Sequence, residues 1–278
     1  MLIPNIFVFL TLLCSTSSYP KYRSVVNTNI QDPEEIGGDF EGDILLTPVT
    51  IFRGIGKRDL SARWPNGIVP YEISLDYDAY DRAKIISAIR RLERVVSLDP
   101  NSASYCIRFR PKTDDDKYFI SIKNGSGCSS YVGRVFEGGQ KVTLQMKSYC
   151  VDREATVMHE FIHGEKKHSF LSYSFSYSVI ALGFWHEQSR PDRDDYVTID
   201  FNNVEPGREH NFNKYSFEVT DTLSLPYDYN SVMHYSKTAF SMNGLPTIVT
   251  KSPNVWIGQR NSLSATDIEE VRKYYNCN

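Results

Sequence analysis

Residues 155–163 read ATVMHEFIH, and residues 181–194 read ALGFWHEQSRPDRD. His159 and His163 are four residues apart, so on a helix their imidazoles lie on one face about one turn apart and can reach the same ion. Glu160 projects near that face and can take a proton from a water molecule whose pKa a metal lowers. We therefore expect His159 and His163 to bind a metal ion and Glu160 to act as a general base.

A third ligand must come from outside this helix, because its next turn points away from the ion. If residues 164–180 are left out, the two stretches join as HEFIHALGFWHEQSRPDRD. The joined sequence contains the HExxHxxGxxH pattern and resembles the astacin family of secreted zinc metalloendopeptidases, in the metzincin clan. The resemblance implies that Gly183 ends the helix and that His186 is the third ligand of one Zn²⁺ per chain.

A second stretch with this resemblance is 227–235, which reads YDYNSVMHY and is similar to the family's methionine turn. The resemblance implies that Met233 forms an apolar floor under the zinc. It also implies that Tyr235 ligates zinc at rest and stabilises the oxyanion during turnover. The alternative is that both are ordinary core residues. We assign His234 a structural role and expect His210 at the surface.

The 17 residues 164–180 interrupt the motif and allow two interpretations. In one, they bulge out of the fold while His186 still returns to the zinc, since lengthening a loop costs only about 0.6 kcal/mol per doubling. In the other, they are a retained intron or gene-model error, because their removal restores the family motif and preserves the reading frame. The retained form would then bind zinc more weakly than the excised form.

Length and composition agree with one secreted globular domain and a removable leader. The 278 residues are 41% hydrophobic with a formal net charge of -3, which gives no reason to expect nucleic acid or an acidic membrane as a partner. Residues 1–18 combine an apolar run, too short to span a bilayer, with small residues, as expected of a signal peptide. Asn124-Gly-Ser126 is a possible glycosylation site that could equally be unused.

Four cysteines remain after residue 18, namely Cys106, Cys128, Cys150 and Cys277. An even number in a secreted chain predicts two disulfides, for which sequence alone allows three pairings. Their contexts look like those of the family's four cysteines. The resemblance implies that Cys106 pairs with Cys277 and Cys128 with Cys150.

Residues 19–58 are expected to form a propeptide. Within them, Phe40-Glu-Gly-Asp43-Ile resembles the FxGD motif of family propeptides, where an aspartate replaces the catalytic water and keeps the enzyme latent. Asp43 is thus the expected inhibitory ligand, with an acidic turn residue as the alternative. An activating protease would cut at Arg53, Lys57 or Arg58, a choice that the sequence leaves open. In the family the new amino terminus is drawn toward the glutamate after the third histidine, which here is Glu187.

The catalytic domain, 59–278, is expected to be an α+β, two-lobed metzincin fold. Its N-terminal lobe would be a twisted sheet with helices, and its C-terminal lobe mostly irregular with a terminal helix. The predicted strands are 68–74, 106–110, 118–122 and 142–146, and the predicted helices are 77–96, 156–163 and 267–274, the last with Ser264 as its N-cap. In the helix 77–96 we expect a buried face of Ala83, Ile86, Ile89, Leu92 and Val96.

The sequence thus predicts a secreted zinc endopeptidase that is made as a zymogen and cleaves extended polypeptides in the extracellular space. The alternative is an impaired or inactive binding protein on the same fold, because the insertion could disrupt the zinc site. Substrate specificity and oligomeric state are left open.

Overall fold

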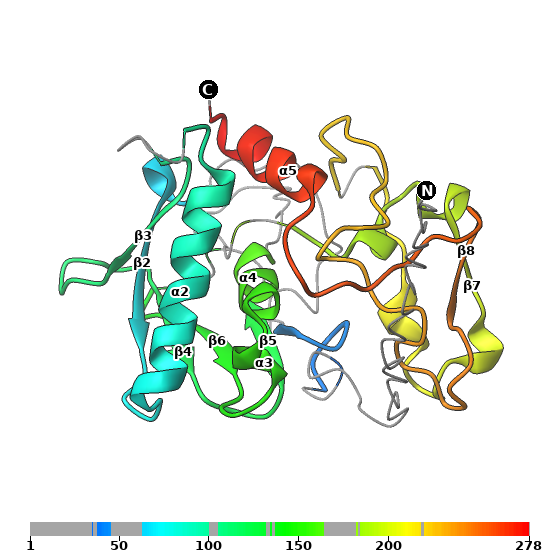
Figure 1. Ribbon diagram of the computed structural model, residues 1–278, viewed down its shortest axis with the longest axis horizontal. Helices are drawn as coiled ribbons and strands as arrows, with labels where there is room; N and C mark the ends of the chain where they lie inside the picture. Colours follow the sequence, from blue (N-terminus) through cyan, green and yellow to red (C-terminus); the bar gives the residue numbers. More distant parts are fainter. Residues whose placement is uncertain are drawn as a thin grey trace, which may run out of the picture. The chain divides into compact units, whose positions relative to one another are not determined.

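A computed structural model describes residues 35, 38–45, 63–99, 105–131, 134, 137–163, 182, 184–217 and 220–277 (Figure 1). These residues form a mixed sheet with covering helices, then a largely irregular second half with a two-stranded sheet and a final helix. Both belong to one contact unit, residues 31–278. The architecture is α+β, as the sequence predicted.

The large sheet has six strands in the order β1-β5-β6-β4-β2-β3. The strands are β1 (Ile44–Leu45), β2 (Ile68–Ile73), β3 (Arg108–Pro111), β4 (Ile120–Lys123), β5 (Cys128–Tyr131) and β6 (Gln140–Leu144). β3, β2, β4 and β6 run parallel to one another, whereas β5 is antiparallel to β6. β1 joins the far edge parallel to β5, so the segment around Asp43 is bound to the domain as an added strand.

The longest helix is α2 (Ala79–Val96), which begins where the Asp78 side chain accepts a hydrogen bond from the Asp81 amide. Its buried apolar face consists of Ile85, Ala88, Ile89, Leu92 and Val96. Ala83 and Ile86, which we expected on that face, are exposed. The predicted face was therefore wrong in the first two turns, because Ile85 and Ala88 carry the helical period there.

The helix α4 (Glu154–Ile162) follows the short α3 (Tyr149–Asp152) and lies beside α2 (Figure 1). Its Phe161 packs edge-on against Phe109 of β3, with ring centroids 5.4 Å apart. On the α2 side, buried Glu93 accepts a hydrogen bond of 2.6 Å from the Phe109 amide. The helix that carries His159 is thus fixed between a sheet and a second helix.

The second half has its own small apolar cluster and little regular structure. It contains the antiparallel pair β7 (Val197–Ile199) and β8 (Ile248–Thr250). Short 3-10 helices are η3 (Glu187–Ser189), η4 (Arg193–Asp195), η5 (Phe201–Asn203) and η6 (Glu209–Phe212), and one more, η2 (Pro65–Gly67), precedes β2. The cluster consists of Val197, Val204, Phe212, Tyr227, Tyr235, Ala239, Phe240 and Ile248.

The chain ends in α5 (Ala265–Tyr275), which begins with a capping box between Ser264 and Asp267. The disulfide Cys106–Cys277 and the hydrogen bonds from Arg272 to the carbonyls of Val96 and Ser97 fasten α5 to the first half. The second disulfide joins Cys128 to Cys150. Both pairings implied by the family resemblance are therefore confirmed.

Three predicted strands differ by one or two residues at each end from the observed ones: 106–110 from β3, 118–122 from β4 and 142–146 from β6. The predicted strand 68–74 and the final helix lie as expected. β1, β5, β7 and β8, which are two to four residues long, were not predicted. Several predictions fall outside the described residues: the signal peptide 1–18, the cut site at Arg53, Lys57 or Arg58, the insertion 164–180, and Gly183. Within the described part of the chain, the search for a helix that is both long and apolar enough to cross a membrane found none.

Candidate metal centre

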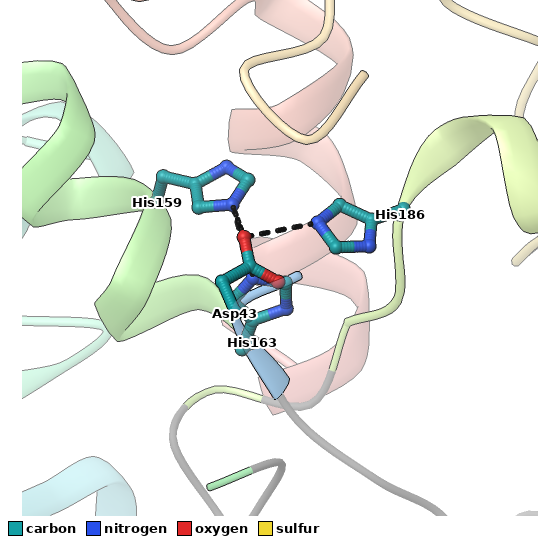
Figure 2. Close-up of side chains that lie close together, drawn as sticks. All are labelled: Asp43, His159, His163 and His186. Atoms are coloured by element: carbon teal, nitrogen blue, oxygen red, sulfur yellow. Dashed lines mark hydrogen bonds and ion pairs between the residues drawn. The ribbon is translucent and has the colours of Figure 1, made fainter. Parts of the chain in front are cut away.

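Four buried side chains from three separate segments converge at one point (Figure 2). His159 lies in α4, His163 directly follows it, His186 precedes η3, and Asp43 precedes β1. Asp43 Oδ2 lies 3.1 Å from His159 Nε2, 3.5 Å from His163 Nε2 and 3.3 Å from His186 Nε2. Figure 2 shows the Asp43 carboxylate pointing into the space between the three imidazoles.

The spacing of these four atoms suits one tetrahedral ion. Zinc binds imidazole nitrogen and carboxylate oxygen at about 2.0 Å, so the ligand atoms of a tetrahedral site lie about 3.3 Å apart. The Nε2 atoms of His159 and His163 are 3.0 Å apart, and the distances to Asp43 Oδ2 bracket the ideal edge. His186 Nε2 is buried without a hydrogen-bond partner among the described residues, as expected of an atom kept for a cation.

Hydrogen bonds on the far side of two imidazoles set their tautomers. His159 Nδ1 lies 2.8 Å from the Val232 carbonyl, and His186 Nδ1 lies 2.9 Å from Glu41 Oε2. Because a carbonyl or carboxylate can only accept, each Nδ1 must carry the proton. Each Nε2 then directs its lone pair at the centre, as a metal ligand requires.

The charges of the centre agree with cation binding. Burial lowers the pKa of His163 to about 4, which keeps this imidazole neutral. Burial also lowers the pKa of His186, but the carboxylates of Asp43 and Glu41 outweigh it and raise that pKa to about 9. Burial raises the pKa of Asp43, yet the neighbouring histidines hold it well below its usual range. The carboxylates of Asp43 and Glu41 thus favour positive charge at the centre, as the binding of a divalent cation requires.

The other residues expected at the centre are buried as well. Glu160 is fully buried in α4 between the two helix histidines, and Met233 is also buried. The Tyr235 ring lies 4.5 Å from the His186 ring, and its hydroxyl donates a hydrogen bond to the Glu41 carbonyl. The fold thus brings His159, His163, His186 and Asp43 together and packs the Tyr235 ring against His186, while Gly183, expected to end the helix, is not described.

The segment around Met233 is held by one buried carboxylate. Asp267, in the first turn of α5, accepts hydrogen bonds from Ser231 Oγ at 2.7 Å and from the Val232 amide at 2.9 Å. The Val232 carbonyl in turn receives His159 Nδ1. A chain of hydrogen bonds therefore connects the final helix to a metal-facing imidazole.

The described residues on either side of the insertion lie beside each other. The Leu182 amide donates to the Phe161 carbonyl at 3.0 Å, and the Phe184 amide donates to the Ile162 carbonyl at 3.1 Å. If residues 164–180 were absent, these bonds would span four and five residues, which is the pattern at the end of a continuous helix. The described chain therefore resumes beside the end of α4, and the three imidazoles come together despite the insertion.

Glu187 lies one residue beyond His186 and is buried against Arg190, with 3.3 Å between Oε1 and Nη1. Its Oε1 also accepts a hydrogen bond of 2.7 Å from the Asp228 amide. Burial raises the pKa of Glu187 to about 8, against the opposing charge of Arg190. A small cavity beside it is lined by Trp185, Glu187, Arg190, Thr220, Asp221 and Glu270, among others.

The remaining polar predictions lie away from the cluster. His234 is buried between the Tyr227 hydroxyl, at 2.7 Å, and the Tyr235 carbonyl, at 2.8 Å, and does not point at the centre. His210 is exposed, as expected of a surface residue. Asn124 is also exposed, and its glycosylation stays a prediction.

Sequence reasoning missed one residue of the centre. Glu41 was read only as the variable position of the FxGD motif, yet its side chain is fully buried and contacts His186, Ser189 and Tyr215. The sequence marks Glu41 only as an acidic residue two positions before Asp43, the expected zinc ligand. Nothing in that spacing indicates which imidazole it reaches.

Comparisons with known proteins agree on one family. The family model described as Astacin, a family of peptidases, matches residues 56–165 and 177–276, so it leaves out 166–176 within the insertion. Human meprin A subunit beta is 42% identical over 248 residues, covering 88% of this chain. Zinc metalloproteinase nas-14 of Caenorhabditis elegans is 41% identical over 216 residues, covering 77% of this chain.

Among solved structures, the hatching-enzyme zinc protease high choriolytic enzyme 1 of the medaka Oryzias latipes is similar with a TM-score of 0.65 and 33% identity. The match covers 81% of this chain and 100% of that one. The chain spans about a third of the length of the curated relatives, 30% of meprin A subunit beta and 37% of nas-14. On the family match and these identities, the chain belongs to the astacin family of peptidases.

Proposed function

We propose that the chain is a zinc endopeptidase made as a latent zymogen, in which Asp43 blocks the metal. The observation that carries this proposal is that Oδ2 of Asp43 lies within 3.5 Å of all three imidazole Nε2 atoms, although His159 is 116 residues away along the chain. A nitrogen that presents its lone pair cannot donate a hydrogen bond to a carboxylate. A cation bound between the three imidazoles and Asp43 would explain why these atoms converge.

The astacin family is zinc-dependent, and the His159, His163, His186 and Asp43 cluster offers a donor set that zinc favours. Bound there, zinc would polarise a peptide carbonyl and lower the pKa of a nearby water molecule. Catalytic zinc sites keep one position open, whereas four protein ligands close the site. With Asp43 in the fourth position the centre would be silent, and removal of the propeptide would open it.

Two residues carry the proposed chemistry around the metal. Glu160, buried in α4 between the ligand turns, would take a proton from the attacking water and deliver it to the leaving amine. The Tyr235 hydroxyl, whose ring packs on His186, would stabilise the oxyanion once the Glu41 carbonyl is withdrawn. The substrate would be an extended polypeptide.

Activation would follow a cut at Arg53, Lys57 or Arg58 by another protease. We propose that the new amino terminus then enters the cavity beside Glu187. Glu187 and Glu270 both line this cavity, and burial raises the pKa of each carboxyl. An incoming ammonium would offset that unfavourable burial.

The setting would be extracellular. Two disulfides suit an oxidising compartment, the stretch 1–18 would direct secretion, and exposed Asn124 would accept a glycan. Neither a nucleic acid nor a membrane is part of the proposal.

The test is peptide hydrolysis by the chain cleaved between residues 53 and 58. Cleaved Glu160→Gln should lose about 100-fold to 10,000-fold in rate while keeping its zinc. Exposed Glu209→Gln is the matched control and should retain full activity. A cleaved wild-type chain that holds zinc and binds peptides without cutting them would instead establish a binding protein, and an active Glu160→Gln variant would refute the assigned mechanism.

A further inference from the structure

A second carboxylate of the same segment approaches the centre from the outside. Glu41 is fully buried, and its Oε2 lies 2.9 Å from His186 Nδ1 and 3.4 Å from Ser189 Oγ. Its Oε1 accepts a hydrogen bond from the Tyr215 hydroxyl, and its backbone carbonyl accepts one from the Tyr235 hydroxyl. Asp43 lies on the opposite nitrogen of the same imidazole, at 3.3 Å from Nε2.

Local backbone preference does not explain a glutamate at this position. Glu41 has φ +50° and Gly42 has φ +89°, so the tight turn before Asp43 passes through the left-handed region. A residue with a Cβ loses about 1 to 2 kcal/mol there, and glycine or asparagine would fit the turn better. A long acidic side chain in such a turn therefore points to the contacts that it makes.

The partner of His186 differs in kind from the partner of His159. His159 Nδ1 donates to the Val232 carbonyl, which belongs to the domain itself. His186 Nδ1 donates to a carboxylate that would leave with the propeptide. A carboxylate behind a ligand histidine fixes its orientation and increases its basicity.

We propose that Glu41 is a positioning residue for latency, which keeps Asp43 on the metal. Its side chain holds His186 Nδ1 and the Tyr215 hydroxyl, and its backbone carbonyl holds the Tyr235 hydroxyl. We call this set of contacts the clamp. This inference rests on the proposed zymogen function and deepens it. Both carboxylates would depart together on activation, which releases the Tyr235 hydroxyl at the moment that the fourth position opens.

The test compares uncleaved full-length variants loaded with Co²⁺, whose absorption bands report the ligand set. Glu41→Gln keeps an oxygen for Tyr215 but loses the charge on His186, and Glu41→Asn relieves the turn but cannot reach either partner. Asp43→Ala gives the spectrum of the open site. Asp39→Asn is the matched control, because Asp39 lies in the same loop and its side chain hydrogen-bonds Ser129, while among the described residues no hydrogen bond joins it to a histidine of the cluster.

In Glu41→Gln and Glu41→Asn we expect the spectrum to move toward that of Asp43→Ala. Peptide hydrolysis by the uncleaved zinc form should rise about 10-fold, the usual size of an effect behind a metal ligand. Asp39→Asn should match the wild type. Cleavage removes residue 41, so full activity of the cleaved variants would show that they are folded.

If both Glu41 variants keep the wild-type spectrum and latency while Asp43→Ala opens the site, the clamp is refuted and the zymogen proposal stands. If Asp43→Ala itself leaves the spectrum and the latency unchanged, the zymogen proposal fails. A turn-only role for Glu41 predicts that Glu41→Asn is more latent than the wild type, which is the opposite of our expectation.

Discussion

Each half of the domain is stabilised by a different kind of interaction. Before residue 164 the described chain forms a six-stranded sheet and the helices α2, α3 and α4, which supply most of the main apolar core, and its backbone groups pair in regular ladders. After residue 184 short 3-10 helices alternate with turns. Buried charged side chains there hold the backbone by hydrogen bonds. Arg193, for example, donates to the carbonyls of Gln188 and Phe212.

The difference matters because the metal centre draws on both halves. His159 comes from a helix fixed by packing, and His186 comes from an irregular segment fixed by hydrogen bonds. The insertion lies between them. The ligands of the regular half are therefore set mainly by packing, with one hydrogen bond from His159 Nδ1 to the Val232 carbonyl of the other half. The ligand of the irregular half depends on specific hydrogen bonds.

The largest effect is expected from removing the irregular half's ligand. Four-ligand zinc sites bind with about 10 to 16 kcal/mol, so losing His186 should remove about a quarter of that, or several hundredfold in affinity. Zinc titration against a competing chelator measures this in the uncleaved His186→Ala chain. Exposed His210→Ala is the matched control, and equal affinities of the two variants would show that residue 186 does not bind the metal.

A second contrast separates packing from hydrogen bonding. Asp267→Ala removes the acceptor of Ser231 Oγ, the Val232 amide and the Ser264 amide and should destabilise the fold by about 2 to 4 kcal/mol. Ile122→Ala in β4 should destabilise it by a similar amount, about 2 to 4 kcal/mol, through a cavity.

Denaturant unfolding measures both losses, and zinc affinity distinguishes the two variants. Because Val232 holds His159, only Asp267→Ala should also weaken zinc binding at a denaturant concentration where both remain folded. Equal zinc affinities would mean that the methionine segment and the metal are not coupled.

Excision of residues 164–180 tests the junction between the halves. The flanking hydrogen bonds already have the spacing of a continuous helix end, so the excised chain should fold with the same centre. Closing a loop of this length costs about 2 kcal/mol of chain entropy, which the excised chain would regain as stability. Thermal and denaturant unfolding of the two chains measure the gain, and a less stable excised chain would contradict the adjacency of the two ends.

The smallest effect is expected at the surface of the regular half. Arg91 pairs with Glu154 at 2.8 Å, with side chains 40% and 34% exposed. Arg91→Ala should lower the free energy of unfolding by about 1 kcal/mol or less, because exposed ion pairs are screened. Denaturant unfolding at low and high salt checks this, and a loss comparable to that of Ile122→Ala would overturn the division of forces.

The sequence predicted the regular half well for a physical reason. Helical periodicity and the capping residue Ser264 are local signals, so the long helices lie close to where we expected them. Strand positions shifted because β4 and β6 are buried on most positions, which weakens the alternation that marks a half-exposed strand. The face of α2 was misjudged because apolar residues also occur on its exposed side, such as Ile86.

The metal ligands could be predicted from sequence because their spacing follows from helix geometry and a family motif. Glu41 could not, since its role depends on a left-handed turn that directs the side chain past Asp43 to the back of His186. The second half resisted prediction for the same reason. Arg190 and Asp267 act over 35 residues or more, on carbonyl and amide groups that no local pattern marks.

X-ray absorption at the zinc edge of the uncleaved full-length chain tests the central claim most directly. Three imidazoles and one carboxylate on a single ion predict four nitrogen or oxygen ligands at about 2.0 Å, with the scattering of three rings and no sulfur. Zinc that is absent, or that shows fewer than three imidazole ligands, would contradict the convergence of His159, His163 and His186 with Asp43 on one metal.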